Sequence, residues 1–138
     1  MYFLYSLKKI KYFLVFILSI FIAFPSAGYA EWKKMRESAD GISYYIDFKR
    51  IRKQGGYVYF WQLSDYLKPT KKGNFSAKKF SQGDCKKFRF KILSSSYHKE
   101  EMGKGRSDGQ DPVERGWRYP LPNSVIETSL KAVCKHIR

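Results

Sequence analysis

The sequence predicts an α+β fold: an antiparallel sheet of about five to six strands, with one C-terminal helix packed on one face and tethered by a disulfide. Three observations predict it. Residues 42–48 and 86–93 alternate between apolar and polar side chains, as half-buried strands do. Glycine-containing turn signals separate the strand candidates. Residues 124–138 change to a helical spacing and contain one of the two cysteines.

The leading segment predicts export. It begins with three lysines, which are Lys8, Lys9 and Lys11. An apolar run over residues 13–24 follows, and Pro25 and a group of small side chains end it. This order is typical of a secretory signal, so we expect residues 1–30 to be a signal peptide cleaved after Ala30, and residues 31–138 to form one domain. The apolar run is shorter than the ~20 residues of a transmembrane helix, and an uncleaved membrane anchor is the alternative.

Export places the mature chain in an oxidising compartment, in the periplasm or at the cell surface. No cysteine lies near the expected cleavage position, so we expect no lipid anchor on an N-terminal cysteine. The chain has 27 Lys and Arg against 12 Asp and Glu, a net charge of +15, of which residues 31–138 hold +12. A charge of this size favours an anionic partner, while 18% aromatic residues argue against disorder.

The first half of the domain reads as a series of strands. Residues 32–38 form a short polar candidate, which ends at the hairpin signal Asp40-Gly41. Residues 42–48 follow, with their apolar side chains at alternate positions. Residues 57–63 are apolar or aromatic throughout, which predicts a central strand that is covered on both faces, or covered on one face with aromatics exposed on the other.

The second half is less regular. Residues 68–84 are rich in Lys, Gly, Ser and Pro, and predict a solvated connection with a short strand around residues 75–80 as an option. Residues 86–93 form the clearest amphipathic strand of the chain. Residues 97–102 are a candidate extension of the hairpin that this strand forms. Residues 103–115 contain three glycines and a proline, which predicts a mobile loop.

The C-terminal helix has a start signal and an apolar stripe. Ser124 and Glu127 form a capping box, in which each side chain satisfies a backbone amide of the first turn. Helical spacing places five apolar side chains on one stripe: Ile126, Leu130, Val133, Cys134 and Ile137. We therefore expect this stripe, including its cysteine, to face the sheet.

Cys85 and Cys134 are the only cysteines, and we expect them to form a disulfide after export. The bridge closes a loop of roughly 50 residues, for which the chain-entropy estimate is ~4 kcal/mol of stability. Two unpaired buried thiols are the alternative. Cys85 has the parity of the basic residues of the following strand, so either a bulge intervenes or Cys85 precedes that strand.

Several short marks occur in a fixed order across residues 31–138. They are Trp32, Asp40-Gly41, Tyr45, Asp47, Trp61, Asp84-Cys85, Met102-Gly103-Lys104-Gly105, Trp117, Pro122-Asn123-Ser124 and Cys134. In this order the chain resembles the surface-adhesin protein E family. The resemblance implies an antiparallel sheet with the helix tethered to its concave face, display at the cell envelope, and binding of host or extracellular-matrix proteins, with a homodimer as one state.

Candidate catalytic groups are few. The two histidines are His98, which we expect at a solvated strand end, and His136, which suits the dipole of the last helical turn. No serine lies in a nucleophile elbow, and no acidic spacing resembles a calcium loop. We therefore expect a non-enzymatic binding protein without a metal or cofactor. A small secreted enzyme is the remaining alternative.

Basic residues carry the binding prediction. Lys87, Arg89 and Lys91 share one face of the predicted strand, so we expect them to form a candidate surface for a macromolecule. The expected partner is an acidic protein, a matrix protein or an anionic polysaccharide. Nucleic acid fits the charge but not the expected export. A solvated lysine-rich surface is the alternative.

The aromatic residues of the central strand allow two interpretations. Tyr57, Tyr59 and Trp61 pack under the helix, or they form an exposed strip beside lysines that suits a polysaccharide or a peptide. We expect Trp32 and Trp117 in the core or covering the sheet edges. A second hypothesis for function follows from the predicted fold: a soluble periplasmic module that binds a small molecule or an envelope component in the concavity beside the helix.

Overall fold

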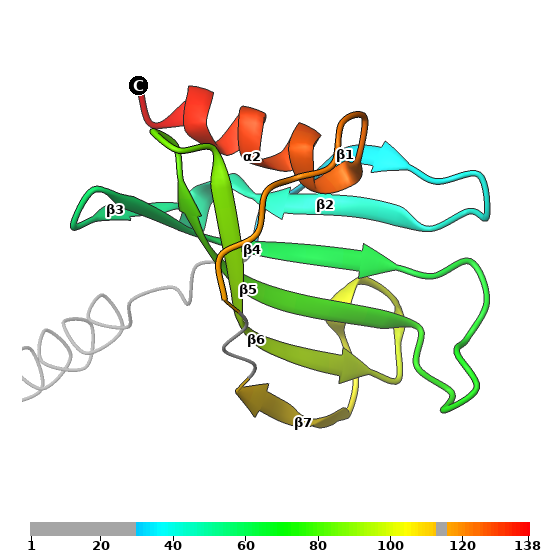
Figure 1. The fold of residues 1–138 in the computed structure, drawn as a ribbon. Helices are drawn as coiled ribbons and strands as arrows, with labels where there is room; N and C mark the ends of the chain where they lie inside the picture. Colours follow the sequence, from blue (N-terminus) through cyan, green and yellow to red (C-terminus); the bar gives the residue numbers. More distant parts are fainter. Residues whose placement is uncertain (1–29, 113–115) are drawn as a thin grey trace, which may run out of the picture.

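The computed structural model describes residues 30–112 and 116–138 (Figure 1). Apart from Ala30, the expected signal peptide lies outside the described residues. Within the part of the chain that is described, no helix is long and apolar enough to cross a membrane. The strands are β1 (Trp32–Glu37), β2 (Ser43–Asp47), β3 (Arg52–Gln54), β4 (Tyr57–Asp65), β5 (Ser76–Asp84), β6 (Arg89–His98) and β7 (Ser107–Pro112).

All seven strands belong to one antiparallel sheet with the order β1-β2-β4-β5-β6-β7. The long strand β4 pairs with β3 at its start and with β2 at its end. A 3-10 turn, η1 (Phe48–Arg50), separates β2 from β3. The helix α2 (Val125–His136) lies across one face of the sheet (Figure 1). This arrangement confirms the predicted α+β fold with its C-terminal helix.

The polar segment that we predicted as a mainly solvated connection contains the full nine-residue strand β5, at the centre of the sheet. Its small polar side chains are buried and hydrogen-bonded. Ser81 Oγ donates to Gln62 Oε1 at 3.0 Å, and Ser76 Oγ donates to the carbonyl of Glu100 at 2.6 Å. The prediction was wrong because composition alone does not show that neighbouring strands satisfy these hydroxyls.

Strand β6 begins at Arg89 and runs to His98, later than predicted at its start and further at its end. Phe88 has a φ of 48°, in the left-handed region, so the chain is still turning there. The predicted mobile loop is also wrong over much of its length. The 3-10 turn η2 (Glu101–Gly103) ends at its first residue, and the edge strand β7 occupies residues 107–112, where it pairs with the second half of β6.

The helix begins as the capping box predicts. Ser124 Oγ accepts a hydrogen bond from the amide of Glu127 at 3.2 Å. The carboxylate of Glu127 turns back to the amide of Asn123, at 2.8 Å, rather than to that of Ser124. The amide of Ser124 donates instead to the carbonyl of Leu121. Both side chains of the box therefore satisfy backbone donors at this helix end.

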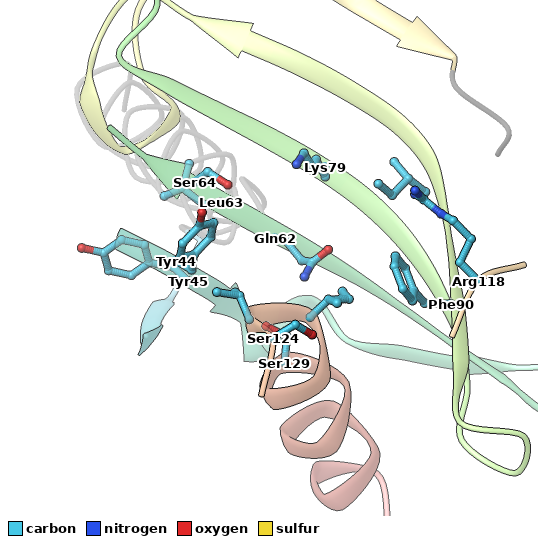
Figure 2. A pocket seen from close by; sticks show the side chains of 13 residues that line it. Tyr44, Tyr45, Gln62, Leu63, Ser64, Lys79, Phe90, Arg118, Ser124 and Ser129 are labelled. Atoms are coloured by element: carbon cyan, nitrogen blue, oxygen red, sulfur yellow. The ribbon is translucent and has the colours of Figure 1, made fainter. Parts of the chain in front are cut away.

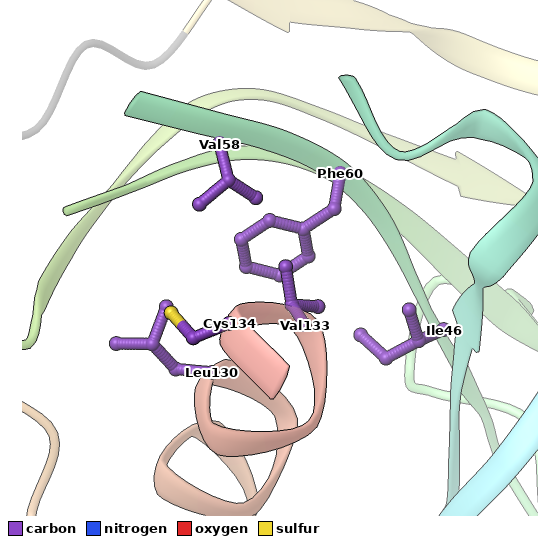
Figure 3. Close-up of a cluster of buried hydrophobic side chains, with 6 residues drawn as sticks. All are labelled: Ile46, Val58, Phe60, Leu130, Val133 and Cys134. Carbon is purple, nitrogen blue, oxygen red and sulfur yellow. The ribbon is translucent and has the colours of Figure 1, made fainter. Parts of the chain in front are cut away.

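The apolar stripe of α2 faces the sheet, as predicted. Figure 3 shows the cluster that it forms with β2 and β4, which consists of Ile46, Val58, Phe60, Leu130, Val133 and Cys134. Val58 and Phe60 occupy alternate positions of β4, so they point to the same side of the sheet. This side, on which α2 packs, is the helix face. The other side is the opposite face.

The disulfide joins Cys85 to Cys134, with their Cα atoms 5.7 Å apart. Cys85 lies in the turn between β5 and β6, and therefore precedes strand β6. Of the two explanations for its position relative to the basic residues of that strand, this one is correct, and no bulge is needed. The bridge attaches the last turns of α2 to the β5–β6 hairpin, and Figure 1 shows this hairpin beside the C-terminal end of α2. Segments that are 49 residues apart in sequence are thereby held together at one end of the molecule.

Candidate functional site

A groove of about 290 Å³ lies on the helix face, beside the start of α2 (Figure 2). Its walls come from β2, β4, β5, β6, the segment before α2 and the first turns of α2. The lining residues are Tyr44, Tyr45, Gln62, Leu63, Ser64, Lys79, Phe90, Ile92, Arg118, Ser124, Val125, Ile126 and Ser129. This groove is the concavity in which the second hypothesis places a small ligand.

The groove is mostly apolar, with a few polar groups at fixed positions. Gln62 is held by the hydroxyl of Ser81, and Lys79 lies next to it across the β4–β5 pairing. Arg118 stacks over the ring of Phe90, with its guanidinium carbon 5.3 Å from the ring centroid. Apolar walls with a small number of placed cations fit a small amphipathic ligand.

The structure separates the three residues of the predicted basic surface. Lys87 is exposed in the turn before β6, whereas Arg89 and Lys91 are on the strand. The side chain of Arg89 is only 20% exposed, because it pairs with Asp84 at 3.0 Å and lies 4.5 Å from the ring centroid of Trp117. The amine of Lys91 also lies over that ring, at 5.3 Å. The expectation that one strand holds all three in a plane is wrong, since the strand starts after Lys87.

Asp84 holds this turn together. Its carboxylate accepts hydrogen bonds from the amides of Lys86 and Lys87, each at 3.1 Å, and from Nε of Arg89. The amide of Lys87, more than the guanidinium of Arg89, holds the pKa of Asp84 below its usual value. A carboxyl whose pKa is lower in the folded than in the unfolded chain stabilises the fold above its unfolded pKa, and this contribution is lost as the pH falls through the folded pKa.

We expect Asp84→Asn to lower the free energy of unfolding by about 1–3 kcal/mol at pH 7, because the variant lacks the charge that these three donors stabilise. The difference from the wild type should shrink as the pH falls below about 4, where the wild-type carboxyl also loses its charge. Urea denaturation between pH 7 and pH 3 measures both effects. Glu101→Gln, at an exposed residue without an ion pair among the described residues, is the control. A difference that stays constant with pH contradicts the assignment.

The disulfide creates a second cluster of positive charge, which we call the basic end. It consists of Lys86, Lys87, Lys135 and Arg138. Lys86 and Lys135 each follow one of the bridged cysteines, so the two pairs are neighbours in space. All four side chains are exposed, and none forms an ion pair in the part of the chain that the structure describes. The sequence carries a signal for this cluster, since a lysine follows each of the two cysteines.

Tyr57, Tyr59 and Trp61 do not lie under the helix. They alternate with Val58 and Phe60 along β4, so they belong to the opposite face. There they contact two further aromatic residues. Trp61 lies 4.9 Å and Tyr59 6.1 Å from Phe80 by ring centroids, and Tyr57 lies 5.3 Å from Trp117. The interpretation as core beneath the helix is therefore wrong. The three side chains lie on the opposite face, as the exposed strip requires, but they are half-buried rather than exposed.

Of the two histidines, only His98 lies in an environment that differs from the predicted one. His98 is buried, with 6% exposure, rather than at a solvated strand end. Its Nε2 lies 3.0 Å from Ser96 Oγ, and burial, followed by the charge of Lys78, lowers its pKa. His136 is exposed in the last turn of α2, edge-on to Phe48 at 5.2 Å. Over residues 30–112 and 116–138, His, Cys, Asp and Glu side chains form no group of three that could hold a metal.

Comparison with known proteins shows to which family the chain belongs. The family model of Surface-adhesin protein E matches residues 32–135. The chain belongs to the surface-adhesin protein E family. The resemblance seen in the sequence is thus confirmed, and the match covers all seven strands and α2 except its last residue. Membership in this family makes the chain a surface adhesin-like binding protein.

Solved structures show the same fold. Crystal form II of Haemophilus influenzae protein E matches with a TM-score of 0.60 and 15% identity, over 80% of this chain and 92% of that one. The selenomethionine form of that protein matches with a TM-score of 0.60 and 16% identity, over 82% and 92%. Protein E from non-typeable Haemophilus influenzae matches with a TM-score of 0.57 and 15% sequence identity, and the match covers 80% of each chain. No curated protein sequence matches the chain.

Proposed function

We propose that the protein is an exported adhesin-type module that binds an acidic segment of a host or matrix protein through the basic end. One observation carries the proposal: the Cys85–Cys134 bridge holds two exposed cation pairs side by side without acidic partners among the described residues. Uncompensated charges attract an acidic partner from a distance. The bridge also fixes the backbone that carries them, so binding does not have to order that backbone.

The three predicted binding residues take different parts in this proposal. Lys87 contributes its charge directly, as a member of the basic end. Arg89 acts as a positioning residue, because its ion pair with Asp84 fixes the turn that presents Lys86 and Lys87. Lys91 lies two residues further along β6, beside Trp117, and adds to the positive potential of the adjoining edge.

The test is charge reversal with a matched control. Lys86→Glu with Lys87→Glu changes two adjacent exposed lysines of the basic end. Lys71→Glu with Lys72→Glu makes the same change in the β4–β5 connection, where neither lysine forms an ion pair with a described residue. We expect the first variant to bind a panel of purified matrix proteins, and polyglutamate as a minimal probe, about tenfold or more weakly than the second. Surface plasmon resonance measures both.

Because the two variants have the same net charge, a general loss of charge affects them equally. Binding of the wild type should also fall steeply between low and physiological salt. Equal affinities of the two variants contradict the basic end as the site. An affinity that does not change with salt contradicts an electrostatic mechanism.

The groove on the helix face favours a second candidate function, a periplasmic module that binds a small amphipathic molecule. The two functions differ in where the protein must be. Protease added to intact cells digests a surface-displayed adhesin and leaves a periplasmic protein untouched. Recovery only from the periplasmic fraction, together with a small molecule that co-purifies, supports the second function over the first.

A further inference from the structure

A glutamine on the opposite face has a side-chain amide that no described residue uses. The side chain of Gln82 in β5 is 7% exposed, yet it forms no hydrogen bond with any residue of the chain that the structure describes. Its neighbour Ser81, which points to the helix face, is hydrogen-bonded to Gln62. A glutamine amide offers two donors and an acceptor. Since no residue of the described chain uses them, they are available to a ligand that lies on this face of the sheet.

Gln82 lines a shallow depression of about 540 Å³ over β3, β4 and β5. Its other lining side chains are Arg52, Gln54, Tyr57, Tyr59 and Phe80. The depression is on the side of the sheet away from α2, and it shares no lining residue with the groove of Figure 2. It is also separate from the four residues of the basic end.

The depression combines aromatic rings with planar polar groups. The rings of Tyr59 and Phe80 stack on each other, with their centroids 6.1 Å apart and their planes inclined by 28°, and both line the depression. Ring faces carry partial negative charge and attract polarised C–H groups, such as those on one side of a pyranose. The amides of Gln54 and Gln82 can donate to and accept from hydroxyl groups, which have the same dual character.

Charge further limits the ligand. Arg52 lies directly across from Tyr59 in the β3–β4 pairing, is exposed, and forms no ion pair within the described ranges. A guanidinium binds carboxylates and other oxyanions through two parallel hydrogen bonds. A neutral sugar would leave this group unused.

An extended peptide fits less well. Peptides that bind sheets usually add a strand to an open edge and use backbone hydrogen bonds. Strand β4, which forms the floor of the depression, is paired with β3 on one side and β5 on the other. The depression therefore offers side chains and no free backbone groups of β4.

From these observations we propose that the depression binds an acidic sugar unit, a uronic acid or a sulfated pyranose, of an anionic polysaccharide. Tyr59 and Phe80 stack against the ring, Gln82 binds a hydroxyl, and Arg52 binds the acidic group. This site goes beyond the proposed protein-binding function, because it uses another face and other residues. Each of the two proposals can fail while the other stands.

The test uses the full-length chain, expressed with its leader and recovered from the envelope fraction. Isothermal titration calorimetry measures binding of a heparin hexasaccharide and a hyaluronan hexasaccharide, with neutral dextran, oligoglutamate and an oligothymidylate for comparison. We expect Arg52→Gln to weaken binding of the acidic oligosaccharides about tenfold, since it removes a charge-assisted pair. Lys71→Gln, the same charge change at an exposed residue outside the site, should alter it less than about twofold.

Gln82→Leu separates a binding role from a structural one. The amide of Gln82 has no hydrogen bond to lose within the described chain, so we expect Tm to stay the same or rise while the affinity for the oligosaccharides falls about tenfold. Equal affinities of the Arg52→Gln and Lys71→Gln variants overturn the proposal. Tighter binding of oligoglutamate or oligothymidylate than of either acidic hexasaccharide also overturns it, and so does a Gln82→Leu variant with unchanged affinity.

Discussion

Reduction of the Cys85–Cys134 bridge is expected to lower Tm by more than about 10 °C. The bridge closes a loop with a sequence separation of 49 residues, and the chain-entropy estimate for such a loop is ~4 kcal/mol. In a domain of this size, each kcal/mol shifts Tm by about 4–8 °C. Differential scanning calorimetry with and without reductant measures the effect. Equal Tm values under both conditions contradict it.

The double variant Cys85→Ala and Cys134→Ala is the control for this experiment. It should melt near the Tm of the reduced wild type, and reductant should not change it further. The basic end provides a functional readout, because the bridge is what holds Lys86 and Lys87 beside Lys135 and Arg138. We therefore expect the double variant to bind polyglutamate more weakly than the wild type at temperatures where both are folded.

Leu130→Ala is expected to lower the free energy of unfolding by about 2–5 kcal/mol, because Leu130 is fully buried between α2 and the sheet. Its partner in the contact is a glycine. A Cβ atom on Gly83 of β5 would lie 2.7 Å from Leu130 Cδ1 and 3.4 Å from Phe60. We therefore expect Gly83→Ala, which would stabilise an unobstructed strand, to destabilise this one by about 1–3 kcal/mol.

The two substitutions should not be additive. Leu130→Ala removes the atom that the methyl group added by Gly83→Ala would meet, so the double variant should be more stable than the sum of the single effects predicts, by about 0.5–3 kcal/mol. Urea denaturation of the four proteins measures this coupling. Gly116→Ala, at an exposed glycine with no atom within 4 Å of the added Cβ, should change stability by less than about 0.5 kcal/mol. Strict additivity contradicts the close approach of helix and sheet.

Local patterns predicted the parts of the fold that have local causes. The capping box at Ser124 and the apolar stripe through Leu130 fixed the helix and the face that it buries. The pairing of the cysteines followed from their number and the expected compartment. In these cases the residues that decide the structure are close in sequence, or have only one candidate partner.

Strand β5 shows where this reasoning stops. Its sequence is polar and contains a glycine, and these features are typical of solvated connections. Ser76 is nevertheless buried, because the carbonyl of Glu100 accepts a hydrogen bond from its hydroxyl group. Gly83 is required because Leu130 approaches it from the helix. Both causes lie in distant parts of the chain, so no local pattern shows them.

The candidate sites divide in the same way. The alternation of side chains along the strand implied that Tyr57, Tyr59 and Trp61 share one face of the sheet. Which face α2 covers was decided only by the tertiary structure, in which the helix packs on the other one. Likewise, Lys87 was identified from its charge, while its separation from the strand of Arg89 depends on the turn at Phe88.

By itself, the sequence determined the class of fold, the helix with its cap, the bridged cysteines and the excess of positive charge. These features depend on composition and on short-range periodicity. The tertiary structure alone decided which side chains meet. It placed Lys86 and Lys87 beside the end of α2, where they complete the basic end. It also placed the amide of Gln82 beside aromatic rings, without a partner in the described part of the chain. Such meetings depend on strand register and on the packing of distant segments, which a single sequence does not record.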